Sequence, residues 1–297
     1  DQGIDWLPAP YRRFGFAAAL EALRALYRLV RLCRDRRVSH IHCFCTPAGV
    51  SGYLLSLWTG IPLIIDSYEP HADAMVETGT WRSDGLAFRI LFLFERLQSR
   101  RATAVVAAAK GMRDYARSRY GVEFRRFYVK PACVDLELFK REGPAPDALR
   151  KELGLEGKLV CIYAGKLGGI YFDREIFDLL KAGSALWGDR FRALFLTNDS
   201  REVLERFCRD SGFASSLISR FVDHKNIPDY MALADFALTP VKPVPTKRHC
   251  TPIKDGEYWA MGLPVIITRG ISDDSDLIES NGIGAVLGGL APQDYAR

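Results

Sequence analysis

Short apolar runs alternate with longer amphipathic stretches along the chain, which is the rhythm of strands and helices around parallel sheets. In the first half these runs are SHIHCFC (39–45), PLIIDS (62–67), TAVVAAA (103–109) and RRFYVKP (125–131). In the second half they cover residues 158–165, 191–198, 217–224, 234–241, 264–268 and 284–287. The pattern predicts an α/β fold in which helix-length segments separate most of the strands.

A charged segment rich in proline and glycine, REGPAPDALRKELGLEGK (141–158), separates the two halves. We therefore expect two tandem Rossmann-like, doubly wound domains, over residues 1–150 and 151–297, with an interdomain cleft where ligands bind. The chain begins without Met and ends on Arg297 without a helix stop signal. We expect that both natural termini, including a first strand and its loop, lie outside it.

The composition argues against several classes of protein. With 48% hydrophobic and 26% charged residues, the 297-residue chain is globular rather than disordered. Its net charge of +5 is too small and dispersed to indicate a nucleic-acid partner. Seven cysteines without a C-x-x-C pair argue against disulfides and zinc, and no apolar run reaches the roughly 18 residues of a membrane span. We expect a cytoplasmic protein that needs no metal.

The densest cluster of candidate site residues is HCTPIKDGEYWAMGLPVIIT (249–268). Thr251 is expected to cap a helix that has Pro252 in its first turn. The free amides at such a helix start attract an anion, and Lys254 adds a positive charge there. Glu257 shares a face with Lys254, so a phosphate and a sugar hydroxyl would satisfy both charges. An ordinary i,i+3 ion pair is the alternative.

A glycine loop follows the first predicted strand of the second half, in CIYAGKLGGIYFDRE (161–175). Gly165, Gly168 and Gly169 let the backbone approach a ligand closely, and the amides can meet phosphate oxygens beside Lys166. The spacing is neither a dinucleotide fingerprint nor a Walker loop, so a plain strand-to-helix turn is the alternative.

Two features of the first half are also candidates. A strand is expected to end in a polar loop at 64–75, where His71 either orients a sugar hydroxyl or is a structural residue. In the predicted helix 17–37, Arg24, Arg28 and Arg31 form what we call the arginine stripe. It fits an anionic membrane surface, with a solvated basic face as the alternative.

The segment TPIKDGEYWAMGLPVI resembles the signature of the retaining group 1 (family 4) glycosyltransferases of the GT-B fold, written roughly S-P-x-K-x-x-E-Y-x-A-x-G-x-P-V-I. YAGKLGGIY is similar to the donor-side glycine loop of that family. VDHKNIPDYMALADFALTP and KPACVDLELF are similar to its segments before the signature and between the domains. The resemblance spans most of the chain.

The resemblance implies a nucleotide-diphosphate sugar as donor, with Glu257 on the ribose hydroxyls and the transferred sugar facing His71. It places Lys254, Lys166 and the amides of the glycine loop at the diphosphate. The expected catalytic residues are therefore His71, Lys166 and Lys254. The expected donor-binding residues are Gly165, Gly168, Gly169, Thr251, Pro252, Ile253 and Glu257.

The implied reaction is sugar transfer with retention to a glycan or lipid-linked precursor of the cell envelope or a polysaccharide, on the inner face of the membrane. The donor phosphate helps to deprotonate the acceptor, so no cofactor or protein nucleophile is expected. His249 stands where the family often has a second glutamate, so we expect that the sugar-hydroxyl contacts either differ or come from nearby groups such as Asp255 or Arg248. Two alternatives are a sugar-nucleotide epimerase on the same fold and a non-catalytic sugar-nucleotide or lipid-binding module.

Overall fold

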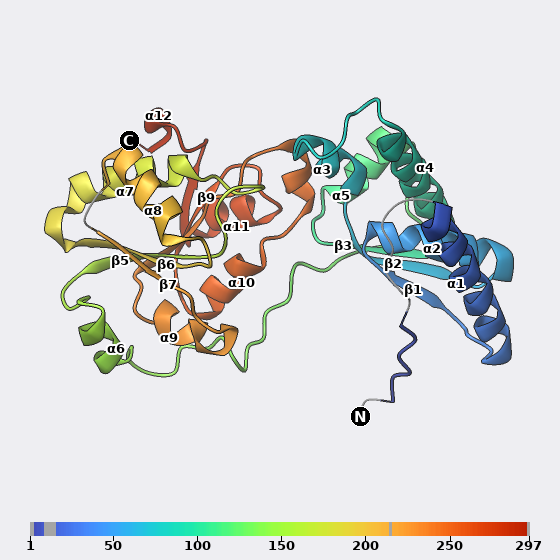
Figure 1. Cartoon of the computed structure of the whole chain (residues 1–297), viewed down its shortest axis with the longest axis horizontal. Helices are drawn as coiled ribbons and strands as arrows, with labels where there is room; N and C mark the ends of the chain where they lie inside the picture. The colour runs from blue at the N-terminus through green and yellow to red at the C-terminus, as the bar shows by residue number, and fades with distance from the viewer. Residues whose placement is uncertain (1–2, 9–15, 214–215, 296–297) are drawn as a thin grey trace. The chain divides into compact units, whose positions relative to one another are not determined.

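The computed structural model describes residues 3–8, 16–213 and 216–295, which form two compact units (Figure 1). Unit 1 comprises residues 1–76, 81–107 and 112–128, and unit 2 comprises 77–80, 108–111 and 129–297. The units change at residues 128 and 129, upstream of the expected boundary at 150. The physical reason is that Phe139, Leu153 and Leu155 are buried in the core of unit 2.

Unit 1 contains, among its described residues, a four-stranded sheet in the order β1-β2-β3-β4. Its strands are β1 (Ile41–Phe44), β2 (Leu63–Tyr68), β3 (Ala104–Ala107) and β4 (Phe127–Val129). Each lies within a predicted apolar run except that β2 extends one residue beyond its run. Its helices are α1 (Phe16–Asp35), α2 (Thr46–Thr59), α3 (His71–Glu77), α4 (Leu86–Arg101) and α5 (Met112–Tyr115), and α5 continues into a π-helical turn at Ala116–Tyr120.

Two glycines allow α2 to lie close to its neighbours in unit 1. A Cβ on Gly49 would stand 1.6 Å from Oε1 of Gln98 on α4, and a Cβ on Gly52 would stand 2.1 Å from Sγ of Cys43 on β1. A larger side chain at either position would therefore require Gln98, Cys43 or α2 itself to shift.

Unit 2 contains a six-stranded parallel sheet in the order β10-β9-β8-β5-β6-β7 among the described residues. The strands are β5 (Leu159–Ala164), β6 (Phe191–Leu196), β7 (Leu217–Arg220), β8 (Phe236–Thr239), β9 (Val265–Thr268) and β10 (Gly284–Leu287). The helices are α6 (Asp147–Glu152), α7 (Arg174–Trp187), α8 (Arg201–Ser211), α9 (Ile227–Met231), α10 (Ile253–Ala260), α11 (Asp274–Asn281) and α12 (Pro292–Tyr295).

The strand order of unit 2 reverses between β5 and β8, which are neighbours in the sheet although β6 and β7 intervene in sequence. Alternate residues of β5 enter two different cores, since Val160 and Ile162 pack with α10 and α11 while Cys161 and Tyr163 pack with α7 and α8. Both faces of the sheet are thus covered. Ligands of such sheets bind beyond the carboxyl ends of the strands at the reversal, which here are the loops after β5 and β8.

The α/β fold with two parallel-stranded sheets is confirmed, whereas one local expectation is wrong. Residues 71–77 are the helix α3 rather than a polar loop, and Tyr68 ends β2 with a fully buried side chain. The predicted helix 17–37 is confirmed as α1, which buries Leu26, Val30 and Cys33 at helical spacing. No helix within the described ranges is long and apolar enough to cross a membrane.

Candidate functional site

The loop after β5 needs glycine at three positions. Gly165, Gly168 and Gly169 have φ angles of +150°, +75° and +65°, a region that L side chains rarely adopt. The loop is anchored by Tyr163, whose hydroxyl donates to the Lys166 carbonyl at 2.6 Å. It is also anchored by Asp199, whose Oδ2 accepts the Leu167 amide at 2.7 Å. Sequence reasoning missed Asp199, which lies in the loop after the neighbouring strand β6.

Lys254, in the first turn of α10, places a buried ammonium group directly against this loop. The residue is only 8% exposed, and its Nζ has no hydrogen-bond partner among the described residues. A Cβ on Gly165 would lie 2.7 Å from Nζ, so a larger residue here would displace the ammonium group from its present place. The structure therefore brings together Gly165 and Lys254, which the sequence placed in one site from segments almost ninety residues apart.

Aromatic rings form the other wall around the Lys254 ammonium. Nζ lies 3.9 Å from the centroid of the Tyr171 ring and 4.6 Å from that of Tyr163. Burial lowers the pKa of Lys254 to about 8, while the charges of Asp255 and Glu257 act in the opposite direction. A cation that is desolvated without a hydrogen-bond acceptor is costly, and an anionic ligand would relieve that cost.

The start of α10 differs from the expected cap. Pro252 rather than Thr251 occupies the N-cap position, and no side chain caps the helix. The Thr251 hydroxyl is engaged elsewhere, donating to the Ala108 carbonyl at 3.0 Å and lying 3.1 Å from the Ser272 hydroxyl. The prediction that Thr251 caps the helix is therefore wrong, because these tertiary partners compete for its hydroxyl. The first turn, with Ile253 exposed, keeps backbone amides that no side chain satisfies.

Glu257 does not form the ordinary ion pair with Lys254. Its Oε1 lies 3.6 Å from Nε2 of His224, a histidine that sequence reasoning missed, and its side chain is 14% exposed. The i,i+3 alternative is therefore wrong for this pair, and the two charges remain separately available on one face of α10.

The residues expected to replace the family's second glutamate lie elsewhere. Asp255 is fully buried and accepts a hydrogen bond from the Thr239 hydroxyl, and Arg248 is paired with Asp276 at 3.1 Å. His249 is buried, which lowers its pKa to about 4. The expectation that Asp255 contacts the sugar is therefore wrong, because helical geometry turns it toward the core of unit 2.

The two remaining expected catalytic residues, Lys166 and His71, are more exposed in the structure than Lys254. Lys166 is exposed on the glycine loop. His71 belongs to unit 1, where it is the first residue of α3 and its Nδ1 lies 3.4 Å from Oε1 of Glu69. Its relation to the transferred sugar stays a prediction. Among the described residues, no group of three or more His, Cys, Asp or Glu side chains could hold a metal ion.

Comparisons with known proteins show one domain match and several similar folds. Residues 1–133 match the model of the glycosyl transferase 4-like domain. No curated protein has a sequence that matches the chain significantly. The fold is similar to that of HepE from Anabaena in complex with UDP, with a TM-score of 0.72 and 18% identity over 94% of this chain and 72% of that one.

A second similar structure is the sucrose-phosphate synthase of Thermosynechococcus elongatus. Its TM-score is 0.68 with 13% identity, over 93% of this chain and 67% of that one. At this level of identity, the solved structures establish the fold, and the domain match adds the enzyme class. The chain is therefore a glycosyltransferase of the GT-B fold whose residues 1–133 match the glycosyl transferase 4-like domain.

Proposed function

We propose that unit 2 binds a nucleotide-diphosphate sugar and that the enzyme transfers the sugar, with retention, to a precursor of the cell envelope or of a polysaccharide. The observation that carries the donor site is the buried Lys254 ammonium, which has no hydrogen-bond partner in the described part of the chain and abuts Gly165. HepE, the similar protein from Anabaena, has been crystallised with UDP and with UDP-glucose, which favours a uridine nucleotide here.

The main chemical task of this site is to stabilise the departing diphosphate. Lys254 supplies a positive charge in a water-poor setting, where electrostatic interactions are stronger than in water. The uncapped amides at the start of α10 and the amides of Gly168 and Gly169 add hydrogen-bond donors. Lys166, exposed on the loop, can reach a bound phosphate from the solvent side.

The remaining roles follow the family resemblance. Glu257 accepts hydrogen bonds from the ribose hydroxyls, and His71 contacts the transferred sugar. The donor phosphate takes the acceptor proton as the new glycosidic bond forms, so that retention requires no protein nucleophile. No metal or other cofactor takes part in this scheme.

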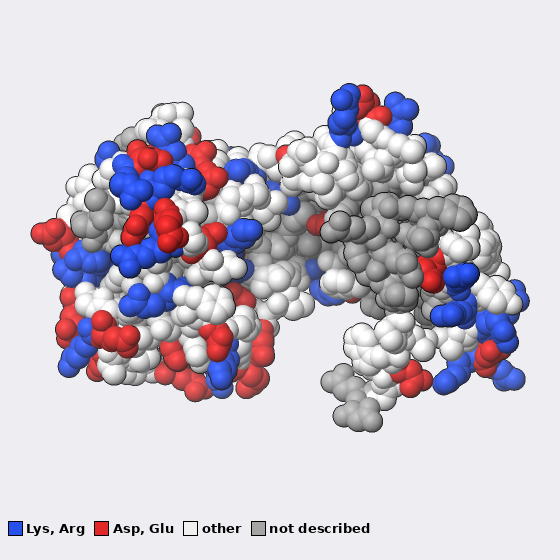
Figure 2. All heavy atoms as spheres, in the orientation of Figure 1, with Lys and Arg blue, Asp and Glu red and all other residues white. Residues whose placement is uncertain are grey.

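The acceptor is a glycan or a lipid-linked precursor at the inner face of the membrane, approached through unit 1. Supporting this, α1 exposes Leu23 and Tyr27 beside Arg24 of the arginine stripe. Figure 2 shows basic side chains, with a few acidic ones among them, over the C-terminal end of α1. An exposed surface of basic and apolar side chains suits an anionic lipid surface.

The test is calorimetric titration of UDP, GDP and ADP into the wild type and into Glu257→Ala. One nucleotide should bind, and the variant should lose about 1–3 kcal/mol of binding free energy, because a charged hydrogen bond to ribose is removed. Glu279→Ala is the matched control, since Glu279 is an exposed carboxylate of unit 2 paired with Arg269. Equal affinity of wild type and Glu257→Ala would remove Glu257 from the site.

A further inference from the structure

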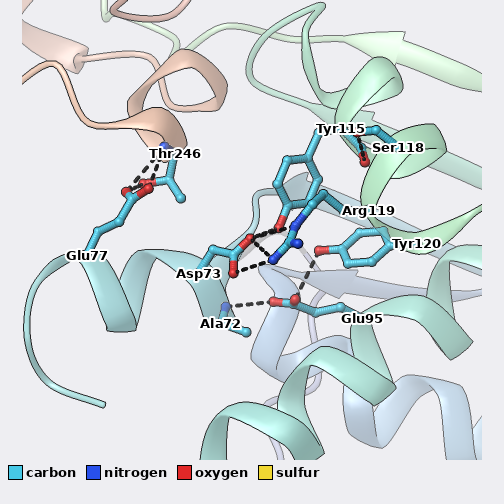
Figure 3. Close-up of polar contacts among 9 residues, drawn as sticks. All are labelled: Ala72, Asp73, Glu77, Glu95, Tyr115, Ser118, Arg119, Tyr120 and Thr246. Atoms are coloured by element: carbon cyan, nitrogen blue, oxygen red, sulfur yellow. Dashed lines mark hydrogen bonds and ion pairs between the residues drawn. The ribbon is translucent and has the colours of Figure 1, made fainter. Parts of the chain in front are cut away.

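Unit 1 contains a fully buried carboxyl group that the proposed reaction does not use. Glu95 lies in α4, and its residue exposure is 0%. Carboxylates are rarely buried to this extent unless hydrogen bonds satisfy them. Figure 3 shows the Glu95 side chain directed at the start of α3 on one side and at Tyr120 on the other.

Both oxygens of Glu95 accept a hydrogen bond. Oε1 accepts the backbone amide of Ala72 at 2.9 Å, and Oε2 accepts the hydroxyl of Tyr120 at 2.9 Å. Ala72 is the second residue of α3, and the first amides of a helix have no acceptor within it. Glu95 therefore caps α3 from a different helix.

Asp73, the residue after Ala72, is held by a second set of hydrogen bonds. Asp73 accepts hydrogen bonds from the Tyr115 hydroxyl and from Arg119, whose Nη2 lies 3.1 Å from Oδ1 (Figure 3). The residue before Ala72 is His71, whose side chain is 31% exposed. The first turn of α3 is thus fixed at Ala72 and Asp73, directly after the partly exposed His71, whose Nδ1 lies beside Glu69.

We propose that Glu95 is a positioning residue for His71. Its carboxylate fixes the first turn of α3 through the Ala72 amide and so sets the direction in which His71 presents its imidazole. The importance of this direction for sugar transfer rests on the proposed function, which places His71 at the sugar. The link between Glu95 and His71 rests only on contacts within unit 1.

We expect the contact between Glu95 and the first turn of α3 to depend on whether the Glu95 carboxyl group is protonated. Burial raises its pKa to about 7, and the hydrogen bonds from Ala72 and Tyr120 oppose that rise. Asp73 raises the pKa further and His71 lowers it. The titratable or charged groups around Glu95 are His71 and Asp73 on α3, Glu69 before it, Tyr68 on β2, Tyr115 on α5, and Arg119 and Tyr120 in the π-helical turn.

Protonation changes the hydrogen bonds that the Glu95 side chain can form. The carboxylate accepts from both donors, but in the neutral acid one oxygen becomes a donor. Only the Tyr120 phenol can reverse its role, because a backbone amide cannot accept a hydrogen bond. The bond to Ala72 also loses its charge-assisted strength, so acid loosens the first turn of α3.

A single amide signal tests the contact, because His71–Ala72 is the only His-Ala step in the sequence. Carbonyl-¹³C histidine and ¹⁵N alanine labelling of the full chain makes the Ala72 amide the only signal in a carbonyl-selected NMR spectrum. It should titrate with a midpoint near pH 7 in the wild type and not in Glu95→Gln. In Tyr120→Phe the midpoint should rise, because the carboxylate loses a stabilising donor.

The His71 ring provides a readout of its own surroundings. In ring-¹³C histidine samples, with His71→Gln to assign the signal, Glu95→Gln should move the His71 ring signals at the alkaline end of the titration as well as at its midpoint, because the ring changes direction. Loss of the Glu95 charge alone would mainly move the midpoint. The other four of the five histidines should be unaffected. An Ala72 amide that does not titrate, or a His71 ring signal unchanged in Glu95→Gln, would overturn the proposal. Sugar transfer unaffected by His71→Ala would instead refute the role of His71 in the proposed function and leave the link to Glu95 standing.

Discussion

Lys254→Met should stabilise the protein while abolishing nucleotide binding. The wild-type side chain holds a buried ammonium between two tyrosine rings and Gly165, with no hydrogen-bond partner in the described residues. Methionine has a similar length and no charge, so it can occupy the same space without desolvating a cation. A residue that serves ligand binding at the expense of stability is common at functional sites.

The pKa of Lys254 gives the magnitude. It falls from 10.5 to about 8, and each unit corresponds to about 1.4 kcal/mol, so the charged side chain costs the fold about 3 kcal/mol below pH 8. Between pH 8 and 10.5 the unfolded chain binds more protons than the folded one, so the free energy of unfolding should rise with pH in that window. Methionine gives up attraction to the rings worth roughly 0.5–2 kcal/mol, which leaves a net gain of about 1–3 kcal/mol.

Urea denaturation of the ligand-free protein at pH 7 measures the gain, and calorimetry with UDP measures the loss of binding. The wild type at 100 times Kd of nucleotide should gain about 2.7 kcal/mol of stability, and the variant should gain nothing. Repeating the denaturation at pH 10 should narrow the difference, because Lys254 is then largely neutral in the fold. A variant that is less stable than the wild type at pH 7, or that retains nucleotide affinity, would refute the reasoning.

Three further predictions concern other parts of the molecule. Burial and the charge of Asp255 raise the pKa of Asp274 to about 8, so stability should fall as pH rises from about 4 to about 8, and Asp274→Asn should flatten this dependence in urea denaturation at pH 5 and 8. Gly165→Ala should weaken nucleotide binding about tenfold or more in calorimetry, because its Cβ would lie 2.7 Å from Lys254 Nζ, whereas Gly188→Ala, with open space around it, should not. Replacing the arginine stripe with glutamine should remove about 3 kcal/mol of binding to phosphatidylserine vesicles, and equal sedimentation of both proteins would contradict a membrane role.

The sequence predicted the elements of the fold with few errors. Nine of the ten strands among the described residues lie within predicted apolar runs, and β2 extends one residue beyond its run, to Tyr68. Strands of a parallel sheet covered by helices are predominantly apolar, which makes them visible in the sequence. The errors are local. Residues 71–77 contain polar side chains that suggested a loop, but Glu95 supplies the missing cap from α4, and a cap from a distant residue leaves no local signal.

The sequence by itself determined the fold class, the strands, the glycine loop and the helix that bears Lys254 and Glu257. These features depend on periodicity and on residues that act locally, such as glycines that permit positive φ angles. Only the tertiary structure decided that Lys254 is buried against Gly165, that Asp255 turns into the core, that Thr251 bonds to Ala108 and that Glu257 faces His224. Burial and hydrogen-bond partners depend on segments far apart in the chain, and the same distant packing sets the pKa values on which the site depends.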